Sequence, residues 1–177
     1  MNKLNRGFIQ IYTGNGKGKT TAAIGQAVRA AGFGLRTYFL MLMKEFPYNE
    51  VSALYSLKDF ILIEQVGKDD YVYRKELPPQ EEIEKVKLAL EKSKQIMLSG
   101  EYNLIILDEI LVATYFGLIT TDDILQLVDA KPFEVEMILT GRYCPKEIIE
   151  RADLVTEMKE VKHYYDKGIL ARKGIES

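Results

Sequence analysis

The chain has 177 residues, a length that suits one compact domain better than two. Its 24 Lys and Arg residues nearly balance its 26 Asp and Glu residues, and the net charge of −2 argues against a nucleic-acid partner held by bulk charge. The single cysteine, Cys144, excludes an intramolecular disulfide and a four-cysteine zinc site.

The chain enters a strand-like run within its first ten residues, so we expect no signal peptide. The longest apolar run, residues 38–43, is far too short to cross a bilayer. These two features predict a soluble cytoplasmic protein with no membrane partner.

The N-terminal part of the chain alternates between strand-like and helix-like segments. Residues 7–13 are rich in β-formers and predict a strand that ends in a glycine cluster. Residues 22–31 are rich in alanine and predict a helix. Residues 36–43 and 59–66 predict two further strands, and the polar stretch 67–79 predicts a loop.

The alternation continues to the C-terminal part. Thr120 and Asp123 have the spacing of a capping box, in which two side chains satisfy free backbone N–H groups at the start of a helix. The predicted helices cover residues 80–99, 110–116, 121–128 and 146–151, and the predicted strands cover residues 103–107, 135–139 and 154–158.

Several of the predicted strands are apolar on both faces, which is typical of a parallel sheet covered by helices on both sides. We therefore predict an α/β fold. No internal repeat or low-complexity linker marks a boundary, so we expect residues 1–177 to form one domain, with residues 159–177 as a polar extension.

A phosphate-binding loop follows the first predicted strand. Gly18, Lys19 and Thr20 match the end of the Walker A pattern G-x-x-x-x-G-K-[ST]. Thr13 stands where that pattern has its first glycine. A loop between a strand and a helix offers anions both a concavity of backbone N–H groups and a helix N-terminus.

Lys19 would add a mobile positive charge, and the Thr20 hydroxyl is placed to bind Mg²⁺. The loop therefore predicts binding of a nucleotide triphosphate, with ATP and Mg²⁺ expected. Lys17 could also contact phosphate, but a solvated loop lysine explains it equally well.

The apolar strand that ends at Leu107 runs directly into Asp108 and Glu109, as in a Walker B element. In parallel sheets, ligands bind at the carboxyl ends of the strands. Asp108 or Glu109 could therefore hold Mg²⁺ or a water molecule bound to it. A pair of solvated acids is the alternative.

Four other residues have a weaker signal. Arg142 follows another apolar strand, where it could neutralise phosphate charge, although a surface arginine is nearly as consistent. His163 is the single histidine, and composition alone does not make it a catalyst. Tyr71 and Tyr73 lie in the predicted loop and could line a pocket for a large flat ligand, while surface packing also explains each of them.

Together these motifs resemble those of the ATP:corrinoid adenosyltransferases of the CobA/BtuR type. The resemblance spans most of the chain, and its C-terminal part separates this family from other P-loop proteins. The matching pieces are residues 13–23, Leu107-Asp108-Glu109, the run from Leu139-Thr140-Gly141-Arg142 through Ala152-Asp153, Val161-Lys162-His163, and Asp166-x-Gly168 with Gly174-Ile175.

The resemblance implies a P-loop, RecA-like α/β fold and a homodimer. It implies transfer of the 5′-deoxyadenosyl group from ATP to the Co(I) centre of a reduced corrinoid, with triphosphate leaving. It also implies that ATP lies reversed in the loop compared with hydrolases, that residues 159–177 contribute to the site, and it leaves room for an electron-donor protein that reduces the corrinoid.

This chemistry agrees with the residues. Co(I) is itself the nucleophile and carries no proton, so the enzyme needs no catalytic Ser, Cys or His. It needs groups that stabilise the charge building on triphosphate. The expected catalytic residues are Lys19, Glu109 and Arg142; the expected metal ligands are Thr20, Asp108 and Glu109; and the residues expected to bind ATP or corrinoid are Gly14, Asn15, Gly16, Lys17, Gly18, Lys19, Thr20, Thr21, Lys44, Tyr71, Tyr73 and His163.

Two stretches depart from the family pattern. Residues 1–6 are all that precede the first predicted strand, where many relatives have a longer segment thought to close over the site. Lys68-Asp69-Asp70 occupies the stretch in which relatives often have aromatic residues against the lower face of the corrin. Tyr71 and Tyr73, just beyond, are the expected substitutes.

Two other functions fit the same loop. A P-loop ATPase or kinase would use Glu109 or Asp108 to orient a water or a substrate hydroxyl for attack on the γ-phosphate, and would release ADP. A non-catalytic nucleotide-binding regulator or corrinoid carrier would bind ATP without turnover.

Overall fold

The computed structural model describes residues 2–44, 48–68 and 76–176. Parallel strands form its centre: β1 (Ile9–Thr13), β2 (Thr37–Leu42), β3 (Ile61–Val66), β4 (Leu104–Asp108), β5 (Glu136–Thr140) and β6 (Leu154–Glu157). Within the described residues they form one sheet in the order β3-β2-β4-β5-β1-β6.

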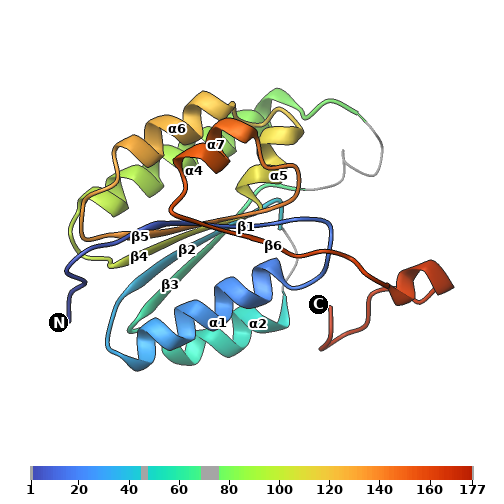
Figure 1. Ribbon diagram of the computed structural model, residues 1–177, viewed down its shortest axis with the longest axis horizontal. Helices are drawn as coiled ribbons and strands as arrows, with labels where there is room; N and C mark the ends of the chain where they lie inside the picture. The colour runs from blue at the N-terminus through green and yellow to red at the C-terminus, as the bar shows by residue number, and fades with distance from the viewer. Residues whose placement is uncertain (1, 45–47, 69–75, 177) are drawn as a thin grey trace.

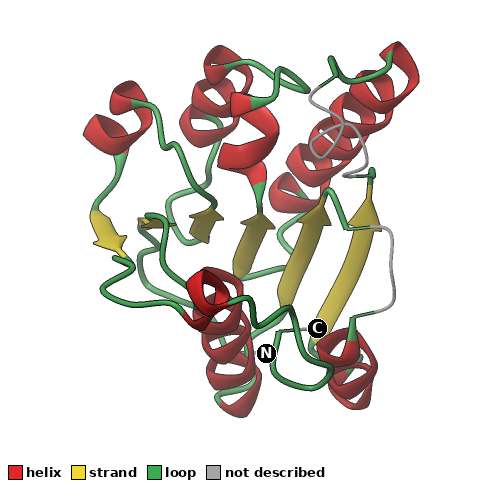
Figure 2. Ribbon diagram, turned by 90° about the vertical axis from the view of Figure 1, so that its right-hand side faces the viewer, coloured by secondary structure: helices red, strands yellow, loops and turns green. Residues whose placement is uncertain are grey.

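Helices cover both faces of this sheet. Those of the described residues are α1 (Lys19–Gly32), α2 (Asn49–Leu54), η1 (Tyr55–Leu57), α4 (Gln80–Leu98), α5 (Ile110–Tyr115), α6 (Thr121–Asp129), α7 (Lys146–Arg151) and η2 (Tyr164–Lys167), of which η1 and η2 are 3₁₀ helices. Figure 1 shows α1 and α2 against one face and α4, α5, α6 and α7 against the other. Figure 2, turned by 90°, shows the strands as yellow arrows between two layers of red helices.

The strand side chains alternate between two apolar cores, because successive residues of a strand point to opposite faces. In β2, Tyr38, Leu40 and Leu42 belong to the core under α4 to α7. Phe39 and Met41 belong to the core against α1 and α2. All of β2 is buried, as a central strand covered on both sides requires.

α1 lies close to the sheet because its buried face is made of short side chains. Ala23, Ala27 and Ala30 are all buried there. Alanine is also the strongest helix former, so this sequence favours the helix as well as its close approach. Gly18 precedes the helix with a φ of 117°, a conformation open to glycine, and lets the chain pass from the loop into the helix at Lys19.

The predicted α/β fold, a parallel sheet with helices on both faces, is confirmed. Every predicted strand and helix is present in the described residues, although α1 begins at Lys19 rather than Ala22. No prediction covered α2, η1 or η2. These elements are short, so none of them contains enough turns for an apolar period to be recognised.

The predicted capping box is also present at the start of α6. The Thr120 side chain accepts from the Asp123 backbone N–H at 3.1 Å, and the Asp123 carboxylate accepts from the Thr120 N–H at 2.8 Å. Both bonds satisfy backbone donors that the helix itself cannot use.

None of the helices in the described parts of the chain is long and apolar enough to cross a membrane.

Thr37 on β2 supplies a test of the core. Its side chain is fully buried, and its hydroxyl has no hydrogen-bond partner among the described residues. A buried unpaired hydroxyl costs free energy that a methyl group of the same shape does not. We expect Thr37→Val to raise the free energy of unfolding by about 1 kcal/mol, measured by urea denaturation.

Thr37→Ser is the matched control, because it keeps the hydroxyl and removes a buried methyl. We expect this variant to lose about 1 kcal/mol. A less stable Thr37→Val would show that the hydroxyl has a partner in the folded protein.

Candidate functional site

The P-loop, residues 14–20, joins β1 to α1 at the edge of the sheet where all the parallel strands end. Its first part packs against the chain that leaves β6. A Cβ atom on Gly14 would lie 2.4 Å from the Met158 carbonyl oxygen, and one on Gly16 would lie 2.8 Å from it. The Gly16 N–H donates to this carbonyl at 2.7 Å. Both glycines are therefore required by the close approach of the backbone at residue 158.

The Lys19 side chain lies inside the loop. Its amine donates to the carbonyl oxygens of Gly14, at 2.8 Å, and Gly16, at 2.7 Å. Burial lowers the pKa of Lys19, and the negative charge of Glu109 opposes that shift. The amine is thus held by neutral acceptors that a phosphate oxygen can replace.

Asp108, the last residue of β4, is completely buried and accepts hydrogen bonds from three other segments. The Thr20 hydroxyl lies 3.0 Å from Oδ1, and the Thr140 hydroxyl donates to Oδ1 at 2.6 Å. The Lys44 amine donates to Oδ2 at 2.7 Å. One carboxylate thereby connects the segments that follow β1 and β2 with the last residue of β5.

Lys44 forms a buried ion pair with Asp108, with 10% and 0% of the two side chains exposed. Burial by itself lowers the pKa of Lys44, but the charge of Asp108 and the hydrogen bond to it outweigh this, and the pKa of Lys44 is raised. Lys44 is therefore a protonated cation at neutral pH.

Glu109 follows Asp108 with a φ of 60°, and its N–H donates to the Thr140 hydroxyl at 3.0 Å. Burial raises the pKa of Glu109, as does the adjacent Asp108 charge, while Lys44 lowers it. Met43 and Tyr143 also have positive φ values, 57° and 61°, just beyond β2 and β5. Such strained residues gather where the surrounding structure serves a site.

Arg142 directly follows Gly141, a glycine at which the packing leaves no room for a side chain. Gly141 has a φ of 140°, and a Cβ atom there would lie 2.8 Å from Cβ of Leu111 in α5. The tight turn after β5 brings Arg142 to the wall of the pocket described next.

These residues surround a pocket of about 710 Å³, a volume suited to a nucleotide-sized ligand. No group of three or more His, Cys, Asp or Glu side chains in the described residues is arranged to hold a metal ion. The pocket is lined by Asn15, Gly16, Lys17, Gly18, Lys19, Thr20, Thr21, Ile24, Lys44, Tyr48, Asn49, Glu50, Ala53, Glu109, Arg142, His163, Gly174, Ile175 and Glu176.

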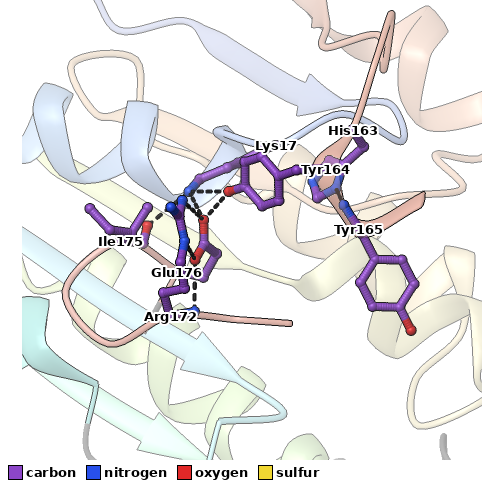
Figure 3. Close-up of polar contacts among 7 residues, drawn as sticks. All are labelled: Lys17, His163, Tyr164, Tyr165, Arg172, Ile175 and Glu176. Atoms are coloured by element: carbon purple, nitrogen blue, oxygen red, sulfur yellow. Dashed lines mark hydrogen bonds and ion pairs between the residues drawn. The ribbon is translucent and has the colours of Figure 1, made fainter. Parts of the chain in front are cut away.

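Most of the predicted site residues thus lie together, and the rest fall into three groups. Gly14, the first residue of the loop, packs against Met158, and Asp108 is fully buried, so neither residue lines the pocket. Lys17 lines the pocket, yet its amine donates hydrogen bonds to Ile175 and Glu176, in the tail formed by residues 158–176 (Figure 3). The predictions for Tyr71 and Tyr73 fall outside the described residues.

The sequence did not predict the role of Thr140, nor that α2 and Tyr48, the residue before it, line one side of the pocket. Thr140 supplies the bond to Asp108 and receives the N–H of Glu109. Its position at the end of an apolar strand, directly before Gly141 and Arg142, was the available signal. α2 lines the pocket through Asn49, and no sequence motif marks it.

Comparison with known proteins agrees with this geometry. Residues 5–177 match the sequence profile of the family described as ATP:corrinoid adenosyltransferase BtuR/CobO/CobP. The chain belongs to this family. The match extends beyond the P-loop through β4, β5 and the tail.

Individual adenosyltransferases from three bacteria show the same relationship. The corrinoid adenosyltransferase of Escherichia coli K12 is 30% identical over 97% of this chain and 86% of its own length. Those of Pseudomonas aeruginosa PAO1 and Salmonella typhimurium LT2 are also 30% identical over 97% of this chain, and over 84% and 86% of their own lengths.

The fold itself is found in a solved structure, the KaiC-like protein PH0186 of Pyrococcus horikoshii OT3. The TM-score is 0.57 at 15% identity, with 89% of this chain and 75% of that chain covered. This likeness concerns the fold, which is the RecA-like α/β arrangement expected for the adenosyltransferase family.

The buried Lys44–Asp108 pair predicts a large loss of stability when one partner is removed. Lys44→Met would leave Asp108 charged and buried, and we expect a loss of about 3–5 kcal/mol in the free energy of unfolding. Urea denaturation at neutral pH measures it. The contribution of Lys44 is full there because its raised pKa keeps it protonated, and it disappears as pH rises through that pKa.

Lys146→Met is the matched control. Lys146 pairs with Glu150 at 3.3 Å, but the two side chains are 85% and 61% exposed. An exposed pair contributes about 0–1 kcal/mol, so this variant should unfold almost as the parent does. Equal losses in the two variants would contradict the role assigned to Lys44.

Proposed function

We propose that this protein transfers the 5′-deoxyadenosyl group of ATP to the Co(I) centre of a reduced corrinoid, in the biosynthesis or salvage of adenosylcobalamin. The observation that carries the proposal is the family match over residues 5–177. The cobalt attacks C5′ of the ribose, the C5′–O bond breaks, and its electron pair leaves with triphosphate.

The pocket contains what such a leaving group needs. Lys19 and Arg142 line it as cations, and the Lys19 amine is bonded to carbonyl oxygens rather than to carboxylates. Both positive charges therefore border the space in which a triphosphate would bind. Donors fixed in advance around a developing anion stabilise the transition state without reorganising.

The oxygen groups present fit Mg²⁺, which prefers carboxylate, hydroxyl and phosphate oxygens. Thr20 and Glu109 line the pocket, whereas both oxygens of Asp108 are engaged beneath it. We assign Thr20 and Glu109 to contact the ion, and Asp108 to orient Thr20. When bound, Mg²⁺ would neutralise charge on the triphosphate.

Several further properties follow from the same assignment. The protein acts as one domain, residues 1–177, in which residues 159–177 form part of the site. It works as a cytoplasmic homodimer. An electron donor reduces the corrinoid, and a partner protein is one candidate for this donor. Light scattering of the purified protein tests the dimer.

The reaction products distinguish this function from a P-loop ATPase or kinase. Anaerobic incubation with ATP, Mg²⁺ and chemically reduced cobalamin should change the corrinoid absorbance and release triphosphate. Release of ADP without a change in the corrinoid would instead assign the pocket to chemistry at the γ-phosphate.

Lys19 is the most direct test of the leaving-group clamp. We expect Lys19→Ala to lower the rate of adenosyl transfer by about 10²–10³, the usual effect of losing one donor of this kind. Lys146→Ala, on the exposed face of α7, should leave the rate unchanged. Near-normal transfer by Lys19→Ala would remove Lys19 from the mechanism.

A further inference from the structure

The segment that follows β6, residues 158–176, forms a tail that returns to the P-loop. The backbone N–H groups of its first residues donate hydrogen bonds to the end of β1 and to the P-loop. The Met158 N–H donates to the Thr13 carbonyl at 2.8 Å, and the Glu160 N–H donates to Oδ1 of Asn15 at 3.1 Å. In Figure 1 the tail continues from β6 through a short helix and turns back toward α1.

Beyond this anchor the tail buries little apolar surface. Val161 is 95% exposed, Leu170 is 70% exposed and Tyr165 is 64% exposed. Burial of side chains therefore contributes little to holding residues 161–176 in place. Their position must depend mainly on polar contacts.

Those polar contacts meet at Glu176 (Figure 3). Its carboxylate accepts from the Lys17 amine at 2.9 Å, from the Tyr164 hydroxyl, and from the backbone N–H of Arg172 at 2.8 Å. The Arg172 guanidinium adds weaker bonds at 3.3 and 3.4 Å. Glu176 thus ties two parts of the tail, at 164 and 172, to the P-loop.

Lys17 is the point of attachment on the body of the protein. Besides its bond to Glu176, it donates to the Ile175 carbonyl at 2.8 Å and approaches the Tyr164 hydroxyl at 3.5 Å. The hydrogen bonds between described residues 161–176 and the rest of the described chain all involve Lys17. The donors from Lys17, Tyr164 and Arg172, in that order, hold the pKa of Glu176 well below its usual range, so it is ionised at neutral pH.

The residues held in this way form a wall of the nucleotide pocket. The pocket that contains Lys19 is also lined by His163, Gly174, Ile175 and Glu176. If Lys17 were released, these groups would lose their contacts with the loop. The pocket would then keep its phosphate cradle and lose one side.

We propose that Glu176 is a positioning residue for nucleotide binding: by holding Lys17, it fixes the tail of the same chain as a wall over the bound ATP. This inference rests on the proposed function for the identity of the nucleotide. It assigns Lys17 to the tail rather than to a phosphate, and it makes the tail one wall of the nucleotide pocket.

The test compares Glu176→Gln, Lys17→Met and the double variant with the parent protein. Glu176→Gln keeps the shape of the side chain and removes its charge, so the bonds from Lys17 and Arg172 lose their charge assistance. We expect the KM for ATP and the Kd for ATP from calorimetry to rise by about fivefold, with kcat changed less than about twofold. The KM for the corrinoid should not change.

The double variant should bind ATP about as weakly as the weaker single variant, because both substitutions break one contact. Additive losses would overturn the proposal, since Lys17 would then act on ATP separately from Glu176. Tighter binding of ATP by Glu176→Gln would overturn it in the same way, by showing that a freed Lys17 contacts phosphate.

Hydrogen exchange measured without nucleotide supplies a readout that does not need activity. Peptides covering residues 161–176 should exchange faster in Glu176→Gln than in the parent, while peptides of the central strands should not change. Unchanged exchange of the tail would overturn the role of Glu176. Faster exchange with unchanged ATP affinity would overturn the role of the tail in the pocket.

Two further variants control for folding and for charge. Glu150→Gln removes an exposed carboxylate that pairs with Lys146 at 3.3 Å on α7, and should change neither exchange of the tail nor ATP binding. Tyr164→Phe removes only a hydroxyl and should shift both readouts in the same direction as Glu176→Gln, by less. A parent protein that binds ATP but forms no adenosylated corrinoid would refute the proposed function and leave the tail test intact.

Discussion

The buried charge of Asp108 is the constraint on which the site depends. A carboxylate that is removed from water must be surrounded by donors, and here they come from Thr20, Thr140 and Lys44. Each donor lies on a different segment, after β1, at the end of β5 and after β2. Satisfying this one charge therefore fixes the P-loop, the end of β5 before Arg142 and the residues around Lys44 relative to one another. The shape of the pocket that they line depends on this arrangement.

The parallel sheet is what makes such a convergence available. Its order places β2, β4, β5 and β1 side by side, so their carboxyl ends face the same space. Glu109 leaves β4 with a positive φ, while its neighbour Asp108 points into the interior. Two adjacent acids thus have different surroundings: Asp108 accepts hydrogen bonds from two hydroxyls and an amine in the interior, and Glu109 lines the pocket.

The fold and the phosphate cradle could be predicted because local sequence determines them. Apolar strands such as the one ending at Leu107, the alanine-rich α1 and the Gly18-Lys19-Thr20 motif all act over a few residues. The role of Thr140 and the attachment of Lys17 to Glu176 could not be predicted in this way. They depend on contacts between residues that lie 32 and 159 positions apart. The charge of Lys17 alone does not show whether its amine pairs with a carboxylate or with a phosphate.

The packing of Gly14 and Gly16 on the backbone of Met158 has a consequence for how a ligand is received. A glycine-rich loop in solution samples many conformations, and ordering it on binding would weaken affinity by the entropy lost. Here the segment at Met158 of the same chain orders the loop as part of folding, so the nucleotide meets a surface already shaped for it. The main change left for this part of the loop is then in the Lys19 side chain, whose amine would exchange two carbonyl oxygens for phosphate oxygens.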